Sequence, residues 1–475
     1  MLQTIKGSAE ELFQQAFEAL KNNQLDKAEH IYQTLLENDP SSPVLVAYLG
    51  ALHMKKGLNE RAAIYLREAI RRYPDLIDAW VNLGCAYKHQ QKIVEAREAF
   101  RKAVELTHAD PEKTATDRSL VLCNLGSTYV GTGTPSDGIP LLKQAIELSP
   151  GNEEAHWNLG LAYLELGDYE QGFSEYEYGK RQLTAKHRKY HTDGTPIWNG
   201  TPGQTVVVYG EQGIGDEIMF ASLLPDIMKD CNVILDGHIR LMDLFRHSFP
   251  GLPVYGTREG ADVPWANFHN IDSHISIGSL AKFYRKKLED FPGTPYLKAD
   301  PELFEKYRKK LAALGTRPKI GLSWKGGTAA TNMNARKIKL NQLLPLFDID
   351  ADFISLQYHP DSEEYVKNFN EKYGKNLIHW SDTLADYDET AGLVRNIDLI
   401  ISVPQSVVHL AGALGVDTLQ LCPRRALWQM GPYGEEMPWY SCVKNIWQDE
   451  TETWEPVINQ AKEAACRILQ SNTEI

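Results

Sequence analysis

Small and apolar residues recur with a period of about 34 positions along the first part of the chain. Apolar residues three and four positions apart predict amphipathic helices, and small residues let the two helices of one unit pack closely. We therefore expect five helix–turn–helix units between about residues 10 and 181, with a longer step in a polar loop near residues 108–116. The repeats are marked by the pairs Leu49-Gly50, Leu83-Gly84, Leu125-Gly126 and Leu159-Gly160.

The pattern changes after about residue 204, where short β-branched runs alternate with helical segments. This alternation predicts parallel sheets with helices on both faces, so the expected fold class is an α-solenoid followed by an α/β region. Strands are predicted at 205–210, 232–237, 252–255, 320–324, 352–357, 377–380, 399–403 and 418–421. Helices are predicted over 217–229, 239–248, 277–287, 301–315, 406–415 and 455–469.

The stretch from Val206 to Phe220 has the pattern of a buried strand, a glycine turn and the start of a helix. Gly213 and Gly215 allow a tight turn and the close approach of a ligand. Asp216 falls in the first turn of the helix, at the carboxyl end of the strand. A carboxylate at this place can cap the helix or take part in chemistry, and both interpretations stay open here.

A second cluster of candidate residues follows strands of the later α/β part. Lys325 comes directly after the strand at 320–324. In the helix over 406–415, Ser406 is the predicted N-cap, His409 lies in the first turn and Gly415 ends the helix. A helix N-terminus at a strand end favours a pyrophosphate, and a lysine beside it adds a point charge. A solvated loop lysine and a helix-capping histidine are the alternatives.

Composition narrows the class of protein. The formal net charge of -13 argues against a nucleic-acid partner, which would require a basic face. The 6 cysteines form no C-x-x-C pair, and residues 1–27 hold no apolar run of signal-peptide kind. No stretch reaches membrane-spanning length, so we expect a reduced, cytoplasmic protein. The Asp-x-Asp spacings at 348–352 and 386–388 lie before a strand and at a helix start, so no metal is expected.

The period of about 34 residues is that of tetratricopeptide repeats, which the first part of the chain resembles. Asn82, Asn124 and Asn158 occupy one repeat position, just before three of the Leu-Gly pairs. The O-linked N-acetylglucosamine transferases, whose repeats are similar, use such an asparagine ladder to hold protein substrates, because a carboxamide both donates and accepts hydrogen bonds. Asn is also common at this repeat position, so a structural role remains open.

Several motifs in order resemble the tetratricopeptide-repeat glycosyltransferases, whose catalytic part is similar to the ADP-heptose–lipopolysaccharide heptosyltransferases. The resemblance covers nearly the whole chain and implies a two-lobed GT-B fold made of two Rossmann-like domains. It implies a repeat domain at 1–182, a linker at 183–203, an acceptor-side lobe at 204–316 and a nucleotide-sugar lobe at 317–475 with a final helix that crosses back. The motifs are Trp198-Asn199-Gly200, residues 210–216, residues 406–415, Trp428, Gly431, Gly434-Glu435 and Pro438-Trp439-Tyr440.

The resemblance also assigns roles. Asp216 matches the family's general base, with Glu211 in reserve, while Lys325 and His409 match contacts to the donor phosphates. The chain departs from the heptosyltransferases at Pro404-Gln405, where they carry Asp-Thr or Asp-Ser, so ADP-heptose is a poor candidate donor. The other expected donor-side residues are Ser323, Gly326, Arg336, Gln405 and Ser406, and the expected acceptor-side residues are Gln212, Asn82, Asn124 and Asn158.

The expected function is an inverting, metal-independent transfer of a sugar from a nucleoside diphosphate sugar to a hydroxyl of a protein that the repeats hold. No cofactor is expected apart from this co-substrate. By analogy with relatives, flagellin or another surface protein is a candidate acceptor. The alternatives are a repeat scaffold whose glycosyltransferase-like region has lost activity, and a transferase that acts on a glycan or lipid-linked acceptor.

Overall fold

The computed structural model describes residues 8–183, 194–258, 263–327, 333–424, 427–432 and 434–471. The chain divides into two compact units, Met1–Ala162 and Tyr163–Ile475. The expected end of the repeat domain, at residue 182, falls within the second of these units. Histidines 187 and 191 of the expected linker lie outside the described residues.

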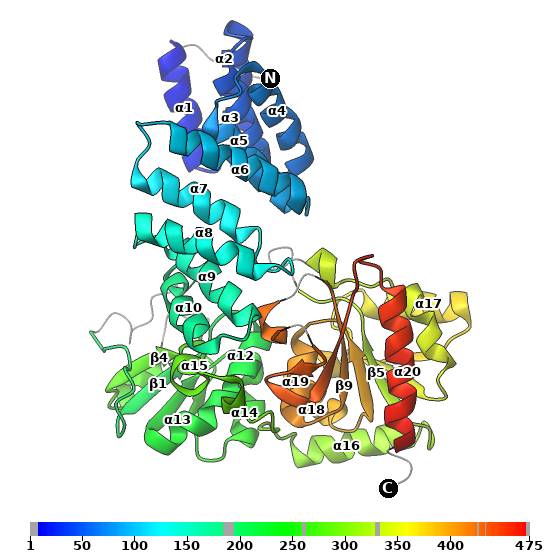
Figure 1. Ribbon diagram of the computed structural model, residues 1–475. Coiled ribbons are helices and arrows are strands. Elements are labelled where there is room, and N and C mark those ends of the chain that lie inside the picture. Colours follow the sequence, from blue (N-terminus) through cyan, green and yellow to red (C-terminus); the bar gives the residue numbers. More distant parts are fainter. Residues whose placement is uncertain are drawn as a thin grey trace. The chain divides into compact units, whose positions relative to one another are not determined.

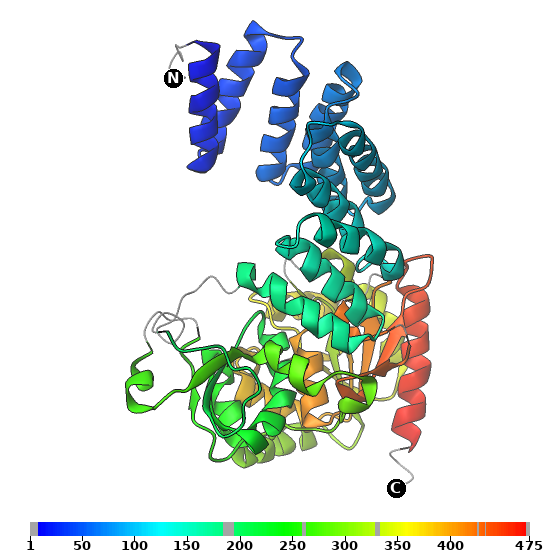
Figure 2. The ribbon, with the colours of Figure 1, turned by 60° about the vertical axis from the view of Figure 1, so that its left-hand side comes forward.

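The first unit is built from successive helix pairs, as the period predicted (Figures 1 and 2). The Leu-Gly pair has a packing reason: a Cβ atom at Gly84 would lie 2.6 Å from Phe100 of the next helix, and one at Gly126 would lie 2.7 Å from Leu142. The helices are α1 (Ala9–Lys21), α2 (Leu25–Asn38), α3 (Pro43–Lys55), α4 (Asn59–Arg72), α5 (Ile77–His89), α6 (Ile93–Ala109), α7 (Ala115–Ser127), α8 (Pro135–Leu148) and α9 (Glu153–Glu165).

The longer repeat step is only partly a loop, which corrects the expectation. Helix α6 has 17 residues, whereas the corresponding helices α4 and α8 have 14 each. The next helix, α7, begins at a capping box in which the Thr114 hydroxyl accepts from the Asp117 N–H and the Asp117 carboxylate accepts from the Thr114 N–H. The extra residues therefore extend α6 before the chain turns.

The second unit opens with a parallel four-stranded sheet in the order β3-β2-β1-β4. Its central strand β1 is almost wholly apolar, and Val206, Val207 and Val208 are fully buried. Strand β4 was missed by sequence reasoning because Ser273 and His274 break the apolar pattern. The strands are β1 (Thr205–Tyr209), β2 (Asn232–Asp236), β3 (Val254–Tyr255) and β4 (Ser273–Ser276).

A second, seven-stranded sheet follows in the order β10-β11-β9-β8-β5-β6-β7. Its strands run parallel except for β10, which pairs antiparallel with β11. The edge strand β10 and its neighbour β11 were not predicted. The strands are β5 (Lys319–Ser323), β6 (Asp352–Ser355), β7 (Leu377–His379), β8 (Leu399–Ser402), β9 (Thr418–Cys422), β10 (Glu436–Met437) and β11 (Tyr440–Trp447).

Two predicted helices of the first α/β part are shorter than expected. The one over 217–229 divides into α12 (Ile214–Phe220), the 3₁₀ helix η1 (Ala221–Leu223) and α13 (Leu224–Asp230), because Pro225 lacks the N–H that a continuous helix needs. The one over 277–287 divides into η4 (Ile277–Leu280) and α15 (Ala281–Tyr284), and ends where the buried Arg285 turns to Asp226. Other helices of this unit include η2 (Ile239–Leu241), α14 (Met242–Ser248), α16 (Pro301–Ala312), η8 (Leu340–Asp348), α17 (Ser362–Tyr373), α18 (Tyr387–Val394), α19 (Ser406–Leu414), η10 (Trp428–Met430) and α20 (Glu455–Ser471).

The two ends of the second unit are placed differently from the expectation. Helix α20 packs against η8, β8, β9 and β11, and its apolar residues join the core of the seven-stranded sheet (Figure 1). It therefore covers the second sheet, whereas the sequence had suggested a last helix that folds back across both lobes. Helix α10 (Tyr169–Leu183), read from the repeats as part of the solenoid, belongs by its packing to the second unit.

Candidate functional site

Asp216 lies at the start of α12, directly after the turn that follows β1. Gly213 is the N-cap of this helix, and the Asp216 carboxylate accepts a hydrogen bond of 3.1 Å from the Gly213 N–H. The capping role foreseen from sequence is therefore present. It fixes the carboxylate at the carboxyl end of β1, the edge of a parallel sheet at which ligands bind.

A second hydrogen bond ties Asp216 to the other sheet. The Gln429 side chain, carried by η10, donates to Asp216 Oδ1 over 3.0 Å. Burial raises the pKa of the Asp216 carboxyl, although the bonds from Gln429 and Gly213 and the charge of Arg336 act in the opposite direction. Sequence reasoning missed Gln429, because it stands more than two hundred residues away in the chain.

The neighbouring Glu217 is fully buried and was also missed. It accepts hydrogen bonds from the His238 N–H at 2.7 Å and from Arg258 at 2.5 Å. Gly210 leaves the space for this carboxylate, because a Cβ atom there would overlap it. One of the motif's glycines therefore serves a buried ion pair that supports the turn.

The side chains of Glu211 and Gln212 form hydrogen bonds with neighbouring segments of the second unit. The buried Glu211 carboxylate accepts a hydrogen bond of 3.0 Å from the N–H of Gly278 in η4. Gln212 has a φ of 56°, in the left-handed region that favours glycine, and its carboxamide donates to the Tyr176 hydroxyl. The structure thus joins both residues to segments beside the glycine turn.

The N-cap of helix α19 lies one residue earlier than expected. Gln405 is the N-cap and Ser406 the first helical residue, so the assignment of Ser406 as N-cap is wrong. The Ser406 hydroxyl accepts instead from Tyr387 over 2.8 Å. Gly415 ends the helix at a φ of 76°, as predicted.

The amino ends of α12 and α19 meet at Gly215. A Cβ atom at Gly215 would lie 3.1 Å from His409 Cδ2 and 3.2 Å from Ser406 Cα. Glycine is needed at this position because the two helices approach so closely. The approach brings Asp216 of the first sheet and His409 of the second to the same junction.

His409 is partly buried, and its Nδ1 lies 3.3 Å from the Tyr440 hydroxyl. Burial lowers the pKa of the His409 imidazole to about 4, and the nearby positive charge of Arg336 contributes to this shift. The imidazole is therefore neutral at physiological pH. It offers a ligand a hydrogen bond and no charge.

The loop after β5 carries Lys325 at the same edge as α19, because β5 and β8 are neighbouring strands. Gln357 fixes this loop: its Oε1 accepts from the Lys325 N–H at 2.9 Å, and its Nε2 donates to the Lys325 carbonyl at 3.0 Å. Within the described part of the chain, the Lys325 ammonium group has no hydrogen-bond or ion-pair partner. It is therefore available to an anion.

The other donor-side candidates contact one another around Pro404. The Arg336 guanidinium donates to the Pro404 carbonyl over 3.3 Å, and the Gln405 carboxamide donates to the Ser323 hydroxyl. Gly326 lies against the same carbonyl, where a Cβ atom would overlap it. The residues that depart from the heptosyltransferase pattern thus tie the loops after β5 and β8 together.

The three asparagines lie in the first unit, on α5, α7 and α9, and each is partly buried. They occupy matching places on the first helices of three successive repeat units. The Asn158 carboxamide donates to the Glu154 carbonyl over 2.8 Å within its own helix. The structure keeps the register that the sequence predicted, and peptide binding by these residues stays a prediction.

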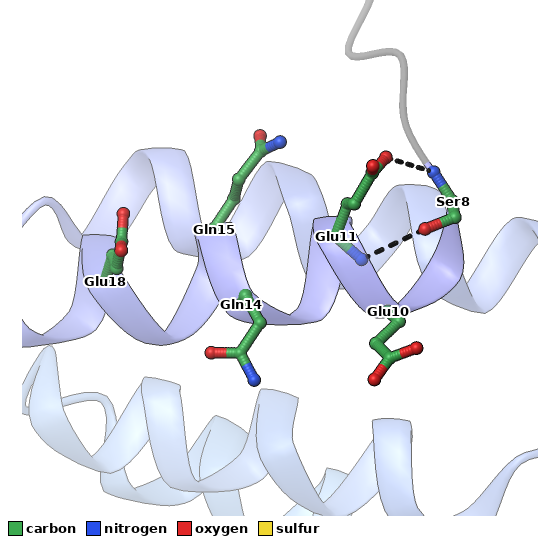
Figure 3. A pocket seen from close by; sticks show the side chains of 6 residues that line it. All are labelled: Ser8, Glu10, Glu11, Gln14, Gln15 and Glu18. Atoms are coloured by element: carbon green, nitrogen blue, oxygen red, sulfur yellow. Dashed lines mark hydrogen bonds between the residues drawn. The ribbon is translucent and has the colours of Figure 1, made fainter.

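A shallow, open depression of about 560 Å³ lies along α1 (Figure 3). It is lined by exposed carboxylates and carboxamides, and two of its residues, Ser8 and Glu11, form the capping box of the helix. Acidic and amide groups on the open face of a helix are what a solvated surface carries. The depression holds none of the predicted site residues.

Metal sites and membrane-spanning helices are absent from the residues that the structure describes. No group of three His, Cys, Asp or Glu side chains in these ranges is arranged to hold a metal ion. None of the helices in the same ranges is both long and apolar enough to cross a bilayer.

Comparison with known proteins identifies the repeats. Family models described as tetratricopeptide repeat match residues 13–77 and 77–110, and one described as TPR repeat matches residues 139–167. Among solved structures, MamA is similar at 21% identity and a TM-score of 0.31, over 35% of this chain and 93% of that one. A thermophilic TPR protein of Thermus thermophilus is similar at 18% identity and a TM-score of 0.32, over 37% and 91%.

Two curated relatives differ in how much of the chain they match. Protein FlbA of Caulobacter vibrioides is 26% identical over 91% of this chain and 80% of its own length. The probable UDP-N-acetylglucosamine–peptide N-acetylglucosaminyltransferase SPINDLY of Hordeum vulgare is 29% identical over 33% of this chain, and the match spans only 16% of SPINDLY. The first part of the chain is therefore an array of tetratricopeptide repeats, and nearly the whole chain is similar to FlbA.

Proposed function

We propose that this protein is a glycosyltransferase of GT-B type that moves a sugar from a nucleoside diphosphate sugar to a hydroxyl of a protein acceptor held by the repeats. The observation that carries the proposal is the junction at Gly215, where the Asp216 carboxylate lies beside the amino end of α19 and within the influence of Arg336. A base and an anion-binding helix end are what the transfer requires.

In the proposed reaction the acceptor oxygen attacks the anomeric carbon from the face opposite the diphosphate. The new C–O bond forms while the bond to the diphosphate oxygen breaks. The configuration at the anomeric carbon is therefore inverted, and the diphosphate leaves with the electron pair. Asp216 takes the hydroxyl proton, and its raised pKa makes it a better proton acceptor than an ordinary aspartate. The first turn of α19 and Lys325 stabilise the leaving diphosphate without a metal ion.

The neutral His409 fits this scheme as a hydrogen-bond donor to a phosphate oxygen. The repeats supply the acceptor, with Asn82, Asn124 and Asn158 proposed to hold its backbone. The similarity to SPINDLY supports a peptide acceptor, although its match covers a third of this chain. The base and sugar of the donor and the identity of the acceptor, for which a flagellin or another surface protein is one candidate, are to be found by experiment.

The proposal is tested with Asp216→Asn, which keeps the size of the side chain and its cap. We expect transfer to fall about a hundredfold or more, because the base is lost, while donor affinity in calorimetry stays the same. The donor is first identified in a thermal-shift panel of nucleotide sugars. Unchanged turnover in Asp216→Asn would remove this residue from the mechanism.

A second candidate function has one observation in its favour. Asp216 forms hydrogen bonds with Gly213 and Gln429, and Gln405 forms one with Ser323. Such internal partners are also expected in a repeat scaffold whose second unit no longer catalyses a reaction. Such a scaffold would bind protein partners and give neither a thermal shift nor hydrolysis with any nucleotide sugar. A transferase for a glycan or lipid-linked acceptor would instead hydrolyse the donor but leave peptides unmodified.

A further inference from the structure

Helix α10 carries one side chain, Tyr176, that contacts both segments holding Asp216. Its hydroxyl accepts from the Gln212 carboxamide in the glycine turn. Its ring centre lies 5.8 Å from that of Trp428, which directly precedes Gln429, the residue that donates to Asp216. Tyr176 is fully buried, so both contacts are shielded from water.

The glycine turn needs such support because Gln212 lies in the left-handed region. A side chain other than glycine persists there only where its surroundings hold it. Arg258 holds the backbone from one side, donating to the carbonyl oxygens of Gln212 and Glu211. Tyr176 contacts the side chain of Gln212, so the two residues together fix the turn.

The next residue on α10 extends the same contact. Glu177 accepts a hydrogen bond of 2.9 Å from the Ser279 hydroxyl in η4. The N–H of the preceding residue, Gly278, donates to Glu211. One turn of α10 therefore reaches both loops that surround the proposed base.

We propose that Tyr176 is a positioning residue, which clamps the glycine turn against η10 and thereby places the Asp216 carboxylate for the transfer. The inference rests on the proposed function for its catalytic consequence. The clamp itself is a property of the fold and can be measured without activity. It makes a repeat helix part of the machinery that holds the base.

The same helix offers a matched control. Tyr169 is buried among Phe173 and Phe291, and its hydroxyl has no hydrogen-bond partner in the part of the chain that the structure describes. Tyr169→Phe therefore removes the same atom from the same aromatic cluster without touching the glycine turn.

We expect Tyr176→Phe to lower kcat about tenfold, equal to about 1.4 kcal/mol, with the KM for the donor unchanged. Tyr169→Phe should leave both constants as they are. Because Tyr176 acts through Gln212, combining Tyr176→Phe with Gln212→Met should cost no more than Gln212→Met alone. A wild-type kcat in Tyr176→Phe, an equal loss in Tyr169→Phe, or additive losses in the double variant would overturn the inference.

Hydrogen exchange of the full chain gives the readout that needs no turnover. Amides in residues 210–217 should exchange faster in Tyr176→Phe than in the wild type, while those of β8 and β9 stay the same. If the wild-type protein transfers no sugar at all, the proposed function fails and exchange alone decides. Unchanged exchange in residues 210–217 would then overturn the clamp, and faster exchange would support it.

Discussion

Two hydrogen-bond donors act against the effect of burial on the pKa of the Asp216 carboxyl. The Gly213 N–H and the Gln429 amide stabilise its charge, while the lack of solvent destabilises it and leaves the pKa raised. The Gln429 Oε1 atom is buried without a partner in the described residues. A proton or an amide hydrogen on residue 216 could donate to that atom, so the site suits a neutral side chain as well as a carboxylate.

The first prediction at this scale concerns stability. A carboxyl whose pKa is raised by folding favours the folded state below its unfolded pKa, and this contribution is lost as pH rises through the folded pKa. Asp216→Asn should therefore raise the Tm at neutral pH, and the gain should vanish as pH is lowered to about 4. Scanning calorimetry across this range checks the prediction, which a variant less stable than wild type at neutral pH would contradict.

The second concerns Lys325, whose ammonium group lacks a partner among the described residues. Lys325→Ala should weaken the binding of a nucleoside diphosphate about tenfold, because a point charge to the phosphates is lost. Lys367→Ala removes the same charge from the exposed face of α17 and serves as the control. Titration calorimetry measures both, and equal affinities in the two variants would place the phosphates elsewhere.

Sequence reasoning found Asp216, its cap and the end of α19, because each depends on residues a few positions apart. It missed Gln429, Arg258 and Tyr176, whose contacts with the glycine turn join distant parts of the chain. Nothing in a local pattern distinguishes such a side chain from its neighbours. The catalytic roles of the predicted residues stay predictions.

Among the elements, α12 and α19 form the central contact of the second unit. Their amino ends meet where Gly215 faces Ser406 and His409. Both helices begin at a strand end, so their unpaired N–H groups point to the same region. Two positive helix ends close together favour an anion between them.

The substitution Gly215→Ala tests the close contact between α12 and α19, because it raises helix propensity while it disturbs this contact. Alanine gains about 1 kcal/mol of helix propensity over glycine, but its Cβ would lie 3.1 Å from His409 Cδ2 and push α19 away. We expect little change in Tm and a roughly tenfold loss of transfer, since small displacements at a reacting centre are costly. Gly151→Ala, with open space around the added atom, should change neither. Transfer at the wild-type rate in Gly215→Ala would show that the junction tolerates movement.

The elements that sequence predicted best are those with one clear pattern. The mainly apolar strands β1, β8 and β9 lie where they were expected, because both faces of each are buried. The edge strand β10 and its neighbour β11 mix polar with apolar residues and were not predicted. The sheet that α20 covers could not be read either, since an apolar stripe shows that a helix packs on a core but not on which one.

On the scale of the whole molecule, the boundary between the units lies before α10. Phe173 and Tyr176 of this helix pack against Trp428, and Phe173 also against Trp439, all of them buried. Aromatic contacts of this size dominate the energetics of an interface. The last repeat helix is thus part of the core of the second unit.

A truncation tests this boundary. A fragment that begins at residue 166 keeps α10 and should unfold cooperatively in urea. One that begins at residue 194 loses α10, and the loss of a single buried Phe already costs about 3–5 kcal/mol. We expect the shorter fragment to unfold at lower urea and to bind a hydrophobic dye, with tryptophan fluorescence as the measure. Equal midpoints would show that α10 is dispensable.

The aromatic packing of α10 also limits how such a protein can acquire new partners. A recombination that exchanged the entire solenoid, α10 included, would place Trp428 and Trp439 against a helix whose side chains do not complement them. Only a crossover upstream of Tyr169 exchanges the preceding repeats and keeps the packing of α10 against Trp428 and Trp439. Chimaeras that borrow foreign repeats should therefore retain this one native helix as their adaptor.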